Sequence, residues 1–169
     1  MPQMTEPMLN EFRQEAETTR RVLERIPADK LTWKPHPKSM SLGQLAIHTA
    51  SIPGRMSYIV AQQDKFEPNP DAFVPTPPKD LQEVHDTFEQ SCKDAAACLQ
   101  GMSNESAMED WTLIVRGKPA FTLPRIAVLR SIMLNHWYHH RGQLSVYLRL
   151  LDVPVPIIYG RSADENPFA

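Results

Sequence analysis

The chain of 169 residues lacks the features that mark several large protein classes. Its two cysteines, Cys92 and Cys98, have a spacing that fits neither a CxxC redox motif nor a zinc knuckle, so we expect buried or half-buried thiols. Lysine and arginine number 18 against 20 aspartate and glutamate residues, which leaves no basic excess for a nucleic acid backbone. No apolar run approaches the roughly 20 residues of a membrane span, and residues 1–10 do not resemble a signal peptide. We therefore expect a cytoplasmic protein that binds neither nucleic acid nor membranes.

Several metal-enzyme motifs are also missing. HExxH does not occur, because Trp137 follows His136 where a zinc protease would have its glutamate, and the inverted HxxEH form is absent too. No Glu-x-x-His element supports a carboxylate-bridged di-iron bundle, and no His-x-Asp/Glu element suggests an oxygenase triad. If the chain binds a metal, we expect a single ion with mostly nitrogen ligands.

The sequence does contain 16 prolines, which divide it into segments of helix length. Apolar residues recurring at intervals of three and four predict four amphipathic helices, over residues 8–26, 42–65, 79–100 and 123–151. Ser41 and Gln44 form a capping box at the start of the second helix, Pro53 and Gly54 predict a bend within it, and Thr122 is the expected cap of the fourth.

The connections complete the predicted architecture. Residues 66–78 contain five prolines, which favours an extended crossover between the second and third helices. Residues 111–115 are rich in β-forming side chains, and Arg116-Gly117-Lys118 could turn them back onto Ala120 and Phe121 as a small hairpin. Residues 152–169 form an irregular tail. We predict an all-α fold with one domain over residues 1–169, a four-helix bundle with a long crossover and a small hairpin before the last helix.

Three histidines lie within the predicted apolar stripes. His136 and His140 are four residues apart on the inward face of the fourth helix, and His48 occupies the middle of the inward face of the second. His139 lies about 100° away from that stripe and flanks it. Imidazoles at positions i and i+4, joined by one from a facing helix, can hold one ion and leave places open for water or substrate. The alternative is that each is a core histidine with its own hydrogen-bond partner.

The segments around these histidines resemble a known family. Residues 41–48, Ser-Leu-Gly-Gln-Leu-Ala-Ile-His, and residues 136–143, His-Trp-Tyr-His-His-Arg-Gly-Gln, are similar to those of the DinB-like (YfiT-like) putative metalloenzymes, as are Val-Pro-Val-Pro at 153–156 and Tyr159-Gly160. The resemblance covers nearly the whole chain. It implies an up-down-down-up bundle whose histidine triad corresponds to His48, His136 and His140.

The resemblance also implies a range of functions. The family includes thiol-dependent S-transferases and a maleylpyruvate isomerase that uses mycothiol, so it implies one divalent ion, zinc or nickel most often, and a low-molecular-weight thiol such as bacillithiol, mycothiol or glutathione. A metal lowers the proton affinity of a bound thiol, so our first hypothesis is a transferase that adds a small thiol to an electrophilic small molecule. The alternatives are a metal-dependent hydrolase and a non-catalytic module that binds metal or dimerises.

Five more side chains are weaker site candidates: Arg55, Gln143, Tyr147, Trp33 and Trp137. Arg55 and Gln143 are close to the histidine direction on their helices and could bind an anionic group or a metal-bound water, with a structural salt bridge as the alternative. Tyr147 could serve a leaving group, although a core tyrosine with a bonded hydroxyl is the expected role. Trp33 and Trp137 either line a pocket or pack in the core.

The remaining predictions concern structural residues. Arg141 is expected to hold a carboxylate on another element. Arg161, Ser162, Asp164 and Glu165 of the tail either close over the metal site or mediate self-association, and the family resemblance implies a homodimer. His36 and His85 are interpreted as surface histidines.

Overall fold

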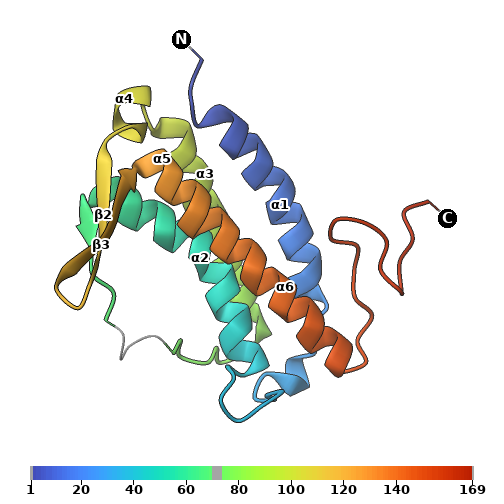
Figure 1. Cartoon of the computed structure of the whole chain (residues 1–169). Coiled ribbons are helices and arrows are strands. Elements are labelled where there is room, and N and C mark those ends of the chain that lie inside the picture. Colours follow the sequence, from blue (N-terminus) through green and yellow to red (C-terminus); the bar gives the residue numbers. More distant parts are fainter. Residues whose placement is uncertain (1, 70–73, 169) are drawn as a thin grey trace.

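The structure is a computed structural model that describes residues 2–69 and 74–168. Its long helices are α1 (Glu6–Glu24), α2 (Leu42–Gln62), α3 (Leu81–Gly101) and a continuous helical run made of α5 (Arg125–Val128), η3 (Leu129–Leu134) and α6 (Asn135–Leu150). α2 packs against α3 and α6, and α1 packs against the same two helices from the other side. α1 and α6 run in one direction, and α2 and α3 run in the opposite one (Figure 1). No helix in the described ranges is both long and apolar enough to cross a membrane.

A small sheet accompanies the helices, so the all-α prediction is incomplete. β2 (Asp110–Val115) and β3 (Lys118–Pro124) form the predicted antiparallel hairpin, which turns at Arg116 and Gly117, both with positive φ. β1 (Lys65–Phe66) lies parallel to β2 on its other side. A strand of two residues carries no alternating pattern, so the sequence alone offered no signal for it.

The ends of the helices differ from the predicted ones for local reasons. α1 begins at Glu6, before the proline at position 7, because a proline is tolerated in the first turn of a helix. The last helical run begins at Arg125, so Thr122 is not its cap. Thr122 belongs to β3, where its hydroxyl lies 2.8 Å from that of Thr112 across the hairpin. Ser103 caps the short helix α4 (Asn104–Ala107). The periodicity of the sequence predicted neither α4 nor the short helix η1 (Ala28–Lys30).

α2 begins at its predicted capping box and contains Pro53, around which it bends (Figure 1). The Gly54 N–H donates to the Ser91 hydroxyl of α3 at 2.7 Å. A Cβ at Gly54 would lie 2.8 Å from the Ser91 Cα, so glycine allows the two backbones to approach closely. The proline and glycine therefore set how α2 packs on α3.

Arg125 fixes the sheet to the helices. Its side chain is only 8% exposed, and its guanidinium pairs with Asp64 at 2.7 Å and with Glu109 at 3.2 Å. Asp64 precedes β1 and Glu109 precedes β2, so a single buried cation holds the starts of both strands beside α5.

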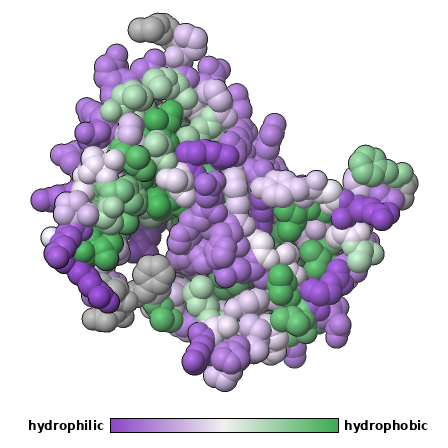
Figure 2. Space-filling view, viewed as in Figure 1, coloured by the Kyte–Doolittle hydropathy of each residue, from purple (hydrophilic) through white to green (hydrophobic). Residues whose placement is uncertain are grey.

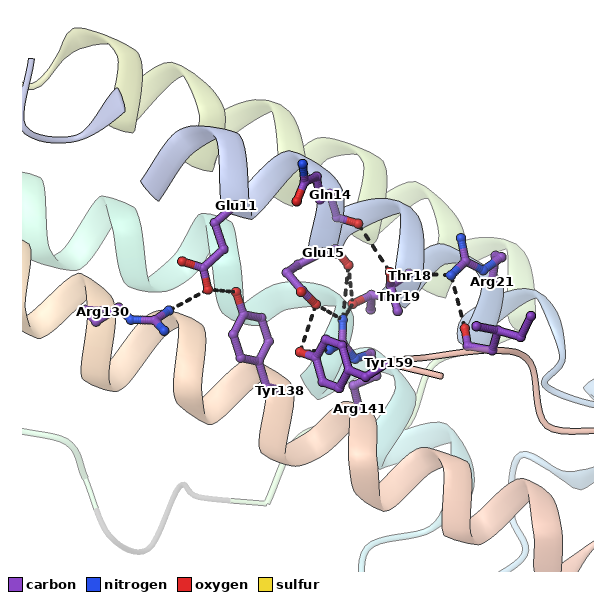
Figure 3. A network of polar contacts seen from close by, with 11 residues as sticks. Glu11, Gln14, Glu15, Thr18, Thr19, Arg21, Arg130, Tyr138, Arg141 and Tyr159 are labelled. Atoms are coloured by element: carbon purple, nitrogen blue, oxygen red, sulfur yellow. Dashed lines mark hydrogen bonds and ion pairs between the residues drawn. The ribbon is translucent and has the colours of Figure 1, made fainter. Parts of the chain in front are cut away.

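A second buried arginine, Arg141, joins α6 to α1 (Figure 3). Its side chain is 1% exposed, and its Nη1 donates to the Glu15 Oε2 at 2.5 Å and to the Thr19 hydroxyl at 3.3 Å. The Tyr159 hydroxyl accepts from Arg141 and donates to Glu15 at 3.1 Å. The guanidinium also lies over the Tyr138 ring. This confirms that Arg141 holds a carboxylate on another element, and it adds the tail to the same network.

The tail lies against the ends of α1 and α6, away from the hairpin (Figure 1). Asp164 pairs with Arg149 at 2.5 Å, and Glu165 pairs with Arg25 at 2.6 Å. Of the two roles considered for the tail, the structure does not support closure over the histidines, because Asp164 and Glu165 pair with Arg149 and Arg25 instead. Self-association through the tail stays a prediction.

Breaking the Arg141 pair should destabilise the fold strongly. Glu15→Ala leaves the Arg141 cation buried without its carboxylate, so the free energy of unfolding should fall by about 3 kcal/mol or more. Glu17→Ala is the matched control, because Glu17 is 67% exposed on the same helix and pairs with Arg20; its cost should stay below about 1 kcal/mol. Urea unfolding measures both, and equal effects would contradict the importance of the buried pair.

Candidate metal centre

The three predicted histidines meet between α2 and α6. His48 comes from the middle of α2, and His136 and His140 come from the first two turns of α6. One ligand nitrogen from each lies within 4.8 Å of the other two. The Nε2 atoms of His48 and His136 are 3.2 Å apart, and those of His136 and His140 are 2.7 Å apart. Nitrogens around a tetrahedral Zn²⁺ are about 3.3 Å apart, so the cluster needs only small adjustments to hold one ion.

Gln143 orients one of these rings. Its side-chain oxygen lies 2.7 Å from the Nδ1 of His140. Because an amide oxygen only accepts, Nδ1 carries the proton and the lone pair of His140 is on Nε2, which faces the other two histidines. This is the arrangement in which a neighbouring group fixes the tautomer of a metal-binding histidine.

The hydrogen-bond balance of the cluster also favours a cation. The His136 Nε2 faces the Nε2 atoms of both other rings. A neutral ring nitrogen has either one proton to donate or one lone pair to accept with. The His136 Nε2 therefore cannot make a full hydrogen bond to both neighbouring Nε2 atoms at once. A cation among the three nitrogens would satisfy all three lone pairs together.

Burial keeps these imidazoles neutral. Loss of water lowers the pKa of His48 to about 4, with contributions from the neighbouring His140 and His136 and from Arg55. Burial likewise lowers the pKa of His140 to about 4, against the opposing effect of its hydrogen bond to Gln143. The pKa of His136 is also lowered, first by burial and then by His139. Neutral imidazole is the form that binds metal, so protons compete weakly for this site.

A cleft of about 430 Å³ opens beside the cluster. In Figure 2 the surface is hollowed between the hairpin side of the molecule and a hydrophilic band over the middle of α6. Its apolar lining comes from α2, η3, the sheet and the segment between β1 and α3, and consists of Ile52, Met56, Phe66, Pro68, Pro75, Trp111, Leu113 and Ile132. His48 and His136 also line it, and Ser51, Arg55 and Glu67 are among its other polar lining residues. A volume of this size suits a small organic molecule.

The structure separates the weaker candidates. Arg55 lines the cleft, and Gln143 contacts His140. Tyr147 donates its hydroxyl to the Met40 carbonyl at 3.2 Å and packs edge-on against Trp33. Trp137 is fully buried, with its ring 5.4 Å from that of Phe12. Tyr147, Trp33 and Trp137 do not line this cleft.

His139 and the cysteines lie as the sequence indicated. His139 is exposed, although it neighbours His140. Cys92 and Cys98 are free and half-buried, and burial raises the pKa of the Cys92 thiol to about 12. Neither cysteine is therefore a reactive thiolate at neutral pH. His36 is exposed, whereas His85 is half-buried.

The cleft walls are what the sequence analysis missed. Trp111 and Leu113 are two residues apart on β2, so they point to the same face of the sheet. This alternation was a usable signal once the hairpin was predicted. Phe66 of β1 and Ile132 of η3 complete the wall, and no local pattern marks either as a site residue.

The comparisons with known proteins agree with this fold. A sequence model of the DinB family matches residues 1–166. The chain belongs to the DinB family. This confirms the resemblance seen in the sequence.

Individual DinB relatives are distant. The uncharacterised protein YrdA of Bacillus subtilis (strain 168) is 24% identical over 165 residues, which cover 98% of this chain and 93% of YrdA. A DinB-like protein from Bacillus cereus ATCC 10987 has a TM-score of 0.71 at 22% identity, over 94% of this chain and all of that one. The DinB-like protein YjoA of Bacillus subtilis gives 0.68 at 19% identity, over 92% and 99%. These structures support the fold.

The lowered histidine pKa values predict a pH dependence for the metal-free protein. Between pH 6.5 and about 4 the unfolded histidines bind protons that the folded ones do not, so the free energy of unfolding should fall as the pH drops through this window. His140→Gln should make the decrease shallower within this window, whereas His139→Gln, which changes an exposed histidine, should not. Urea unfolding at several pH values measures this, and identical slopes in all three proteins would contradict the assignment.

Proposed function

We propose that this DinB-family protein is a four-helix-bundle metalloprotein, with the up-down-down-up order of helices, that holds one divalent ion through His48, His136 and His140. The supporting observation is the convergence of the Nε2 atoms of three neutral histidines, two of which line an apolar cleft. Zinc and nickel are the proposed ions, because imidazole nitrogen suits both.

We further propose that the protein is a transferase that adds a low-molecular-weight thiol to an electrophilic small molecule. A divalent ion in this position would lower the pKa of a bound thiol, so that the thiolate is present near neutral pH. The side chains of this protein would position the reactants. Gln143 orients His140, and Trp111 and Leu113 of the cleft wall would shield the electrophile from water. Thiolate attack would form a carbon–sulfur bond while the electron pair leaves with a group such as chloride or, with an activated double bond, passes to the neighbouring carbon, which then takes a proton from solvent. The proton released by the thiol passes to solvent.

A metal-dependent hydrolase is the second candidate. Glu67 favours it, because this carboxylate lines the same cleft and could accept a proton. Its Oε1 accepts from the Gly117 N–H at 2.8 Å, which holds the side chain beside the hairpin turn.

Metal content tests the first part of the proposal. Untagged protein should contain about one divalent ion per chain, and His140→Ala should remove it because two nitrogens remain. His139→Ala is the matched control, since it changes the adjacent, exposed histidine and should retain the ion. Elemental analysis measures both, with circular dichroism to show that the variants fold. Equal metal loss in both variants would contradict the triad.

The reaction class is tested by a thiol screen. The zinc-loaded and nickel-loaded proteins should conjugate a small thiol to 1-chloro-2,4-dinitrobenzene faster than the metal-free protein, because thiolate attack displaces chloride. Absorbance of the conjugate measures the rate. If the loaded protein hydrolyses p-nitrophenyl acetate without added thiol and shows no conjugation, the hydrolase is correct instead, and Glu67→Gln should then lower the rate.

A further inference from the structure

With a divalent ion bound, the cleft would carry more positive than negative charge. Arg55 and Glu67 are the charged side chains among its described lining residues. A divalent ion together with Arg55 therefore outweighs the single carboxylate, and Glu67 is already engaged by the Gly117 N–H. The remaining lining is largely apolar, so little there would bind a cation.

Arg55 is available to a ligand. Among the described residues it makes no hydrogen bond or ion pair, whereas the buried Arg125 and Arg141 both have carboxylate partners. Its side chain lines the same cleft as His48 and His136 of the triad. An unpaired guanidinium beside an apolar cleft is suited to a planar anionic group.

The position of Arg55 on α2 defines the length of a ligand. His48, Ile52 and Arg55 follow one another at i, i+4 and i+7, so they lie along one face of the helix. Seven residues correspond to about 10 Å along the helix axis. A small molecule could therefore have its reacting atom near the histidines and an anionic group near Arg55, with its apolar part between Ile52 and Trp111.

We propose that the cleft selects a small organic acid, with an aromatic or branched apolar body whose carboxylate or phosphate pairs with Arg55. This inference names the substrate class of the proposed metal site. That such acids are substrates rests on the proposed function. The binding preference itself depends on Arg55 and the apolar walls, so it is measurable with or without the ion.

Ligand binding tests the proposal with three probes of similar shape. Phenylacetate and phenyl phosphate carry the anion, and phenylacetamide is the neutral counterpart. NMR titrations of the whole chain, metal-free and zinc-loaded, should show that at least one anion binds about tenfold or more tightly than the amide, because a hydrogen bond to a charged group contributes that much. The tighter of the two anions identifies carboxylate or phosphate as the preferred group.

Two variants locate the preference. Arg55→Gln should abolish it in the metal-free protein, whereas Arg13→Gln should retain it, since Arg13 is an exposed arginine on α1 outside the cleft. No anion preference in the wild type, or an unchanged preference in Arg55→Gln, would overturn the proposal. Elemental analysis of the same samples reports separately on the metal. A protein without metal that still prefers anions through Arg55 would refute the proposed function and leave this inference standing.

Discussion

The buried ion pair between Arg141 and Glu15 is the constraint on which the site depends. A guanidinium that is 1% exposed has to keep its carboxylate partner, so the face of α6 that carries Arg141 must point toward α1. His140 is the preceding residue and therefore points about 100° away around the helix, toward α2. The same pair thus fixes the rotation of α6 about its own axis and directs His136 and His140 at His48. Tyr159 joins this pair from the tail, which makes the tail part of the support for the site and not its cover.

Irregularities in two helices, η3 and α2, help to place the elements around the histidines. η3 is a π-helical segment that directly precedes the histidine part of the run, and such segments often occur at functional sites. Its wider turn changes the rotation between α5 and α6, so α5 can contact the sheet while α6 faces α2. In α2, Pro53 bends the helix beyond His48, and Gly54 lets the bent part rest on Ser91 of α3. The cleft lies between these adjusted parts.

The sequence predicted the elements whose periodicity continues over several turns. The long helices, the capping box at Ser41 and the inward placement of His48, His136 and His140 all follow from intervals of three and four residues. Thr122 was misassigned because a threonine before a proline suits a cap and a strand equally well, and only its pairing with Thr112 decides between them. β1 and η3 depend on tertiary contacts and hydrogen-bond shifts that leave no local pattern. The histidine cluster was therefore predictable, and most of the cleft was not.

The histidines and the cleft wall are built by different parts of the fold. The histidines and Gln143 lie on long helices that pack in the core, and Gln143 contacts His140 directly. The facing wall comes from a hairpin and a two-residue strand, which are joined to the helices largely through the Arg125 cluster. Changes in Phe66, Trp111 or Leu113 would reshape the cleft without displacing the histidine nitrogens. A fold built in this way can keep one arrangement of histidines while the shape of its cleft varies, because histidine geometry and cleft shape are specified by different parts of the chain.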